Sequence, residues 1–121
     1  MGTLGEDLAV KYLKKQGYKI LHKNWYNFKG KRLGEIDIVA QAKDGEIVFV
    51  EVKTRVVDHV QDFVLPEEQI TQSKLRKMQR VAECYVKSFD LWQKNWRMDA
   101  ISVIIKDGKV HNVTHIKNIY F

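Results

Sequence analysis

The segment 46–54 constrains the fold most strongly, because it has the pattern of a strand that is apolar on both faces. Its apolar residues are β-branched or aromatic and do not alternate with polar ones: Ile47, Val48, Phe49, Val50 and Val52. Such a composition favours a strand that is buried on both faces. Charges are rare in strands of this kind unless they have a use, yet this one ends in Glu51-Val52-Lys53.

Hydrophobic spacing predicts the other elements. Apolar residues three and four apart predict helices over Thr3–Gln16 and Thr71–Phe89. Strand patterns bounded by turn residues predict further strands over 18–28, 35–40, 98–105 and 109–116. The order of helix, three strands, helix and two strands indicates an α/β fold with a mixed sheet flanked by helices. The stretch Arg55–Gln69 contains Pro66 and has the pattern of an irregular binding loop.

Length and composition indicate the broad class of protein. The chain has 121 residues, which we interpret as one domain over residues 1–121. No apolar run approaches the roughly 20 residues of a membrane span, and the start lacks the pattern of a signal peptide. Cys84 is the only cysteine, so no internal disulfide is expected. These features predict a cytoplasmic protein with no membrane contact, and we expect no small-molecule cofactor.

The charge of +6 is distributed in blocks. Residues 11–32 contain eight Lys or Arg and no acid, and residues 71–98 contain seven basic and two acidic residues. Between them, residues 33–70 contain nine acidic and three basic residues. An acidic segment between basic blocks suits a site that holds cations while its surroundings attract a polyanion. The basic residues would equally be explained as the solvated faces of helices.

Three residues carry the chemical hypothesis. Asp37 precedes Glu51 by 14 residues and lies in a neighbouring predicted strand, and Lys53 shares a face with Glu51. If the two strands pair, Asp37 and Glu51 can lie side by side, where carboxylates repel unless a cation separates them. This spacing therefore indicates a metal site, with a surface ladder of cross-strand ion pairs as the alternative.

The donor types favour Mg²⁺ or Mn²⁺ as the cofactor. Carboxylate oxygens and a strand carbonyl, that of Val52, are hard ligands, whereas Cys84 has no partner cysteine for zinc. The ion would polarise a phosphodiester and activate bound water. Lys53 would orient that water or stabilise the developing charge.

Other residues are weaker candidates. Glu6 is either part of a capping box with Thr3 or a further metal ligand. Glu35, which shares a face with Asp37, and Gln69 are candidates for accessory roles. Asp99 is a further candidate, but a structural pair with Arg97 is the favoured explanation for it. The candidates for contacts to nucleic-acid phosphates are Arg55, Gln72, Lys74, Lys77 and Arg80.

Several motifs recur together in one protein family. They are Gly5-Glu6, Gly34-Glu35-Ile36-Asp37-Ile38-Val39, Val48-Phe49-Val50-Glu51-Val52-Lys53-Thr54-Arg55, then Pro66, Glu68, Lys74, Leu75 and Arg97-x-Asp99. In these the chain resembles the bacterial UPF0102 family, also called YraN. That family is similar to archaeal Holliday junction resolvases of the PD-(D/E)xK, restriction-endonuclease-like group. The resemblance implies an αβββαβ core, metal ligation by Asp37 and Glu51, a catalytic Lys53 and a contribution from Glu6.

The leading hypothesis is a Mg²⁺-dependent nuclease that acts on structured or branched DNA. A nucleic-acid-binding module of the same fold without turnover is the alternative, and a protein-interaction role for the carboxylates is a third. By analogy with junction resolvases, which cut two symmetric strands, we also expect a homodimer.

Overall fold

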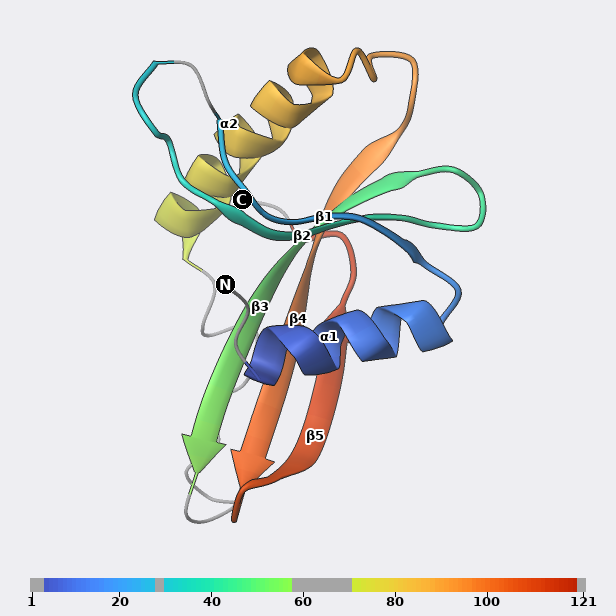
Figure 1. Ribbon diagram of the computed structural model, residues 1–121. Helices are drawn as coiled ribbons and strands as arrows, with labels where there is room; N and C mark the ends of the chain where they lie inside the picture. The colour runs from blue at the N-terminus through green and yellow to red at the C-terminus, as the bar shows by residue number, and fades with distance from the viewer. Residues whose placement is uncertain (1–3, 28–29, 58–70, 120–121) are drawn as a thin grey trace.

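The computed structural model describes residues 4–27, 30–57 and 71–119 (Figure 1). In these ranges the elements are α1 (Leu4–Lys15), β1 (Lys19–Trp25), β2 (Ile36–Gln41), β3 (Ile47–Val57), α2 (Gln72–Ser88), β4 (Trp96–Lys106) and β5 (Lys109–Ile116). Their order confirms the expected αβββαβ core, which β5 extends by one strand.

The five strands of the described residues form one mixed sheet in the order β1-β2-β3-β4-β5. The pairs β1/β2, β2/β3 and β4/β5 are antiparallel. β3 instead runs parallel to β4 over its whole length, from Ile47 opposite Trp96 to Val57 opposite Lys106. Parallel neighbours need a long crossover, and α2 lies within it. β3 is therefore the central strand of the sheet.

Each face of the sheet carries one helix and one hydrophobic core. On the α1 face, Leu13 packs in a cluster with Val48 and Val50 of β3. On the α2 face, Tyr85 packs in a second cluster with Phe49. Successive residues of β3 are thus buried on opposite sides, which explains why its sequence shows no polar alternation.

Two glycines fix the position of α1. A Cβ atom on Gly5 would lie 1.6 Å from Thr54 Oγ1 of β3, so the helix can approach the strand this closely only with glycine there. At the other end, Gly17 has a φ of 92°, and the Tyr18 N–H donates to the Leu13 carbonyl at 3.0 Å in a Schellman motif. The start of α1 is consequently held beside the charged end of β3.

One sequence expectation was wrong. β3 continues to Val57, so residues 55–57 belong to a strand and not to an irregular stretch. The extension follows from pairing with β4, a partner about 50 residues away whose register no local pattern reveals. The rest of the expected loop, with Pro66 and Gln69, and Thr3 of the expected capping box lie outside the described residues. None of the helices in the described ranges is both long and apolar enough to cross a bilayer.

Candidate functional site

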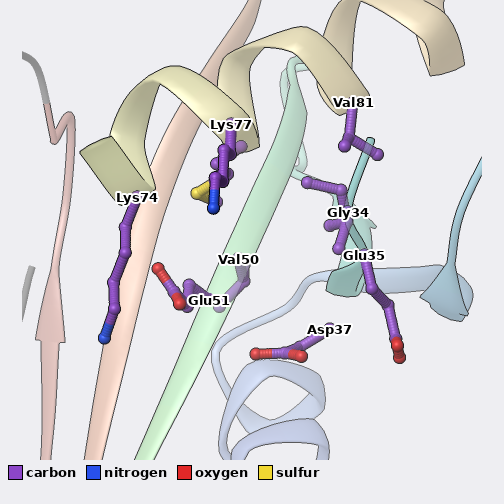
Figure 2. A pocket seen from close by; sticks show the side chains of 10 residues that line it. Gly34, Glu35, Asp37, Val50, Glu51, Lys74, Lys77 and Val81 are labelled. Carbon is purple, nitrogen blue, oxygen red and sulfur yellow. The ribbon is translucent and has the colours of Figure 1, made fainter. Parts of the chain in front are cut away.

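The carboxylates of Asp37 and Glu51 border one cavity, at the end where β2 and β3 face the first turns of α2 (Figure 2). The cavity has a volume of about 170 Å³, and Lys74 and Lys77 of α2 line its opposite wall. Asp37 is the second residue of β2, and Glu51 lies in the middle of β3. The structure thus brings together the two acids on which the sequence hypothesis depends.

Asp37 is held by the backbone of the neighbouring strand. The Val52 N–H donates to Asp37 Oδ2 at 2.8 Å. Burial, together with the charges of Glu6, Glu51 and Glu35, raises the pKa of Asp37 to about 6, against the effect of this hydrogen bond. The folded protein therefore holds a carboxylate whose ionised form is unfavourable without a compensating charge.

Glu51 has one oxygen in an ion pair and one without a partner. Its Oε1 lies 3.1 Å from Lys53 Nζ, and both side chains are mostly buried, at 20% and 27% exposure. Its Oε2 is buried and has no hydrogen-bond partner among the described residues. A buried carboxylate oxygen left unsatisfied is costly, and it is available to a ligand that enters the cavity.

These observations fit a hard divalent cation, which satisfies the free oxygen of Glu51 and neutralises the repulsion at Asp37. Within the described ranges, no three His, Cys, Asp or Glu side chains lie close enough to hold one ion together. Asp37 and Glu51 would therefore need oxygen atoms from the backbone, water or substrate to complete its coordination. The contact that Val52 makes with Asp37 is through its N–H, so ligation by its carbonyl stays a prediction.

Lys53 and Lys74 meet beside Glu51, although they come from β3 and α2. Burial lowers the pKa of Lys53, but hydrogen bonds with Lys74 and Glu51 and the nearby carboxylates outweigh it, so the pKa is raised overall. The hydrogen bond and the charge of Lys53 lower the pKa of Lys74. The carboxylate of Glu51 thus lies close to two amino groups, one from each element.

Glu6 and Glu35 form a second acidic pair near Asp37. Burial and then the charge of Glu35 raise the pKa of Glu6. Glu35 precedes β2 and forms an ion pair with Arg32 at 3.0 Å, and Figure 2 shows its carboxylate directed away from Glu51. Both acids act on Asp37 through their charge, and direct ligation by either stays a prediction.

Sequence reasoning missed Asn24, which lies between these two acids. Oriented with its amide nitrogen toward them, Asn24 donates to Glu35 Oε1 at 2.7 Å and to Glu6 Oε1 at 3.1 Å. Its φ of 53° places it in the left-handed region. The sequence does carry a signal, because asparagine is depleted in strands and, among residues other than glycine, is one of those that adopt this conformation most readily.

Asp99 belongs to a separate buried network. It is fully buried and accepts hydrogen bonds from Arg97 Nε at 3.0 Å and from the Asn118 N–H at 3.0 Å, and it lies 2.7 Å from His115 Nε2. Burial raises its pKa, but the hydrogen bonds to His115 and Arg97 outweigh this, so the pKa is lowered. The expected pair with Arg97 is confirmed, and Asp99 does not line the cavity.

Two of the predicted phosphate contacts, Lys74 and Lys77, line the cavity. Lys74, Lys77 and Arg80 are exposed on α2, and Gln72 is exposed at its first turn. Arg55 is half-buried on β3, two residues beyond Lys53. Gln69 lies outside the described residues. Contact of these side chains with nucleic acid stays a prediction.

Among solved structures, the chain is similar to a repair endonuclease from Pyrococcus abyssi, with 17% identity and a TM-score of 0.49 over 89% of this chain and 41% of that one. It is also similar to EndoMS in a structure of its complex with double-stranded DNA, with 13% identity and a TM-score of 0.42 over 90% of this chain and 40% of that one. The chain thus spans about two fifths of each endonuclease chain, and these likenesses are too distant to carry an argument.

Sequence relatives cover the chain fully. The UPF0102 protein of Syntrophomonas wolfei is 40% identical over 120 residues, which are 99% of this chain and 96% of that protein. The UPF0102 protein of Caldicellulosiruptor saccharolyticus is 43% identical over 122 residues, again 99% and 96% of the two chains. Residues 5–103 match the family described as "Uncharacterised protein family UPF0102". The chain belongs to the UPF0102 family.

Proposed function

We propose that this protein is a divalent-metal-dependent nuclease that acts on structured or branched DNA in the cytoplasm. One observation supports this most: Glu51, whose buried Oε2 has no partner in the part of the chain that the structure describes, borders the same cavity as Asp37, whose pKa is raised. Such an arrangement is unfavourable without a cation and favourable with one.

In this proposal Asp37 and Glu51 hold Mg²⁺ or Mn²⁺, with the Val52 carbonyl as a further ligand. When bound, the ion supplies a Lewis acid for a phosphodiester oxygen and lowers the pKa of a bound water. The Val52 N–H fixes the orientation of the Asp37 carboxylate, and Lys53 fixes one oxygen of Glu51. Both carboxylates are therefore positioned before any ligand arrives.

Lys53 and Lys74 supply the positive charge for the reacting phosphate. Lys53 stays close to Glu51 and is the candidate to orient the attacking water or to stabilise the developing charge. Lys74 reaches the same point from α2 and would bind a phosphate oxygen. The further phosphate contacts would come from Gln72, Lys77 and Arg80 on α2 and from Arg55 on β3.

The substrate form and the assembly are also proposals. DNA is the partner that suits exposed cations around an acidic cavity. A two-fold homodimer would present two such sites to two strands of a branched substrate. The alternative function, a DNA-binding module without turnover, is supported by the same lysines, because they bind phosphates without a metal.

The test compares the parent protein with Glu51→Gln and Lys53→Ala variants on duplex, single-stranded and four-way DNA, with Mg²⁺ or Mn²⁺ titrated from zero. We expect a metal-dependent product from the parent and a loss of at least about 100-fold in rate for both variants. Glu83→Gln, which removes an exposed charge on α2 away from the cavity, is the matched control. DNA binding that weakens with salt, with no metal-dependent product, would refute the nuclease and support the binding module.

A further inference from the structure

Asn24 has an unusual backbone conformation at a specific place in the sheet. β1 and β2 pair at Lys23 with Ile38 and at Trp25 with Ile36, so Asn24 falls between these pairs, opposite Asp37. Its φ of 53° interrupts the extended strand. A non-glycine residue held in this region persists only where the surrounding structure requires it, and such residues gather at functional sites.

The side chain of Asn24 contacts two elements that are far apart in the sequence. Its amide nitrogen carries two hydrogens and lies 2.7 Å from Glu35 Oε1 and 3.1 Å from Glu6 Oε1. One NH₂ group therefore satisfies an acceptor on α1 and an acceptor in the segment before β2. The opposite amide orientation would place three oxygens together without a hydrogen between them.

The two carboxylates that Asn24 joins act on the metal site through their charge. Glu6 and Glu35 both raise the pKa of Asp37, after the effect of burial. The positive groups that face them are Arg32, in an ion pair with Glu35, and Lys23, which acts on Glu6. Both acids therefore act on Asp37 through their charge, and direct ligation by either stays a prediction.

We propose that Asn24 is a positioning residue that holds Glu6 and Glu35 beside Asp37 as an outer ring of negative charge for the divalent cation. The inference rests on the proposed metal site and adds a determinant of its affinity. Outer charges attract the ion, but they also repel one another, and the amide of Asn24 offsets that repulsion. Because the close contact at Gly5 fixes the start of α1, the side chain of Glu6 responds to the loss of the amide while the helix stays in place.

The test is an Asn24→Gly variant, titrated with Mn²⁺ by calorimetry in the absence of DNA. Glycine adopts a φ of 53° without strain, which offsets part of the cost of losing the amide, so we expect the variant to fold and to melt close to the temperature of the parent. The affinity for Mn²⁺ should fall by about 10-fold, the lower end of the loss seen when outer-shell partners of metal ligands are removed. A residue with only a structural role would change the melting temperature and leave the affinity unaltered.

Asn118→Gly is the matched control. Asn118 also has a left-handed backbone, with a φ of 58°, and the contact it makes with Asp99 is through its backbone N–H, which glycine keeps. We expect no change in Mn²⁺ affinity from this control. In a Glu6→Gln, Glu35→Gln background, Asn24→Gly should have no further effect, because its partners no longer carry charge.

The outcomes separate this inference from the function on which it rests. The role of Asn24 would be overturned if Asn24→Gly bound Mn²⁺ as tightly as the parent. It would also be overturned if Asn24→Gly lowered the Mn²⁺ affinity of the Glu6→Gln, Glu35→Gln variant as much as that of the parent. Either result would leave the metal site intact. A parent protein that binds no Mn²⁺ would overturn both. The metal site and the role of Asn24 are both supported if the parent binds Mn²⁺ tightly and Asn24→Gly, but not Asn118→Gly, binds it more weakly.

Discussion

Replacing Asp37 with asparagine should stabilise the metal-free protein at neutral pH, although it removes a proposed metal ligand. The pKa of Asp37 rises from its usual 3.8 to about 6 in the folded protein. Each pH unit of this rise corresponds to about 1.4 kcal/mol, so ionising Asp37 costs the folded state about 3 kcal/mol. An asparagine avoids this cost, and its side-chain oxygen can still accept the hydrogen bond from Val52.

The pH dependence has a defined sign. Because the folded pKa lies above the unfolded one, the parent loses stability as the pH rises from about 4 to about 6, and the loss is complete above pH 7. Urea unfolding in EDTA, followed by tryptophan fluorescence, should therefore show Asp37→Asn more stable than the parent by about 2–3 kcal/mol at pH 7.5. At pH 4 the difference should fall below about 1 kcal/mol. Glu83→Gln, at an exposed position on α2, is the control and should show no such dependence.

Addition of Mn²⁺ completes the experiment. The ion should raise the stability of the parent, because it neutralises the buried charge, and should raise that of Asp37→Asn much less. The reasoning would be refuted if Asp37→Asn were less stable than the parent at pH 7.5 in EDTA. A stability difference that stayed constant from pH 4 to pH 7.5 would refute it equally.

Three shorter predictions concern other parts of the molecule. Gly5→Ala should destabilise the protein by about 1–3 kcal/mol, because its Cβ would overlap Thr54, and a second change, Thr54→Ala, should recover part of this in urea unfolding. Asp99→Asn should cost roughly 1–3 kcal/mol, because it removes the buried anion that Arg97 and His115 share, although Arg97 keeps its ion pair with Glu46, while Mn²⁺ affinity measured by calorimetry stays at the parent value. Since the pKa of Asp99 is lowered, its contribution is present at neutral pH and should be lost as acid protonates it. Lys74→Ala should reduce the slope of log affinity for duplex DNA against log salt by about 1, with stability unchanged.

The sequence predicts the element order because each element has its own periodic pattern. The apolar run of β3 indicates a strand buried on both faces, and the structure places β3 at the centre of the sheet. The length of β3 could not be predicted, because Arg55 to Val57 are held by pairing with a strand about 50 residues further along. Local patterns contain no information about that register.

The same distinction applies to the candidate site. Asp37, Glu51 and Lys53 could be predicted because strand alternation and the spacing within one hairpin place them together. The contacts of Asn24 could not be predicted, since they depend on a left-handed backbone and on acids 18 residues before and 11 residues after it. The meeting of Lys53 with Lys74 also depends on how α2 packs across the sheet, which charge patterns along the chain do not specify.

The position of β3 at the centre of the sheet has a consequence for synthesis of the chain. A ribosome completes α1 and the first three strands well before residues 96–106 exist, so one side of β3 has no neighbour during that interval. The exposed edge of β3 carries unpaired backbone groups, and residues 47–50 of this strand are entirely apolar. Exposed strand edges of this kind pair with other chains. We therefore expect truncation within α2 to yield an aggregating fragment, and we expect nascent chains to need a chaperone until β4 emerges.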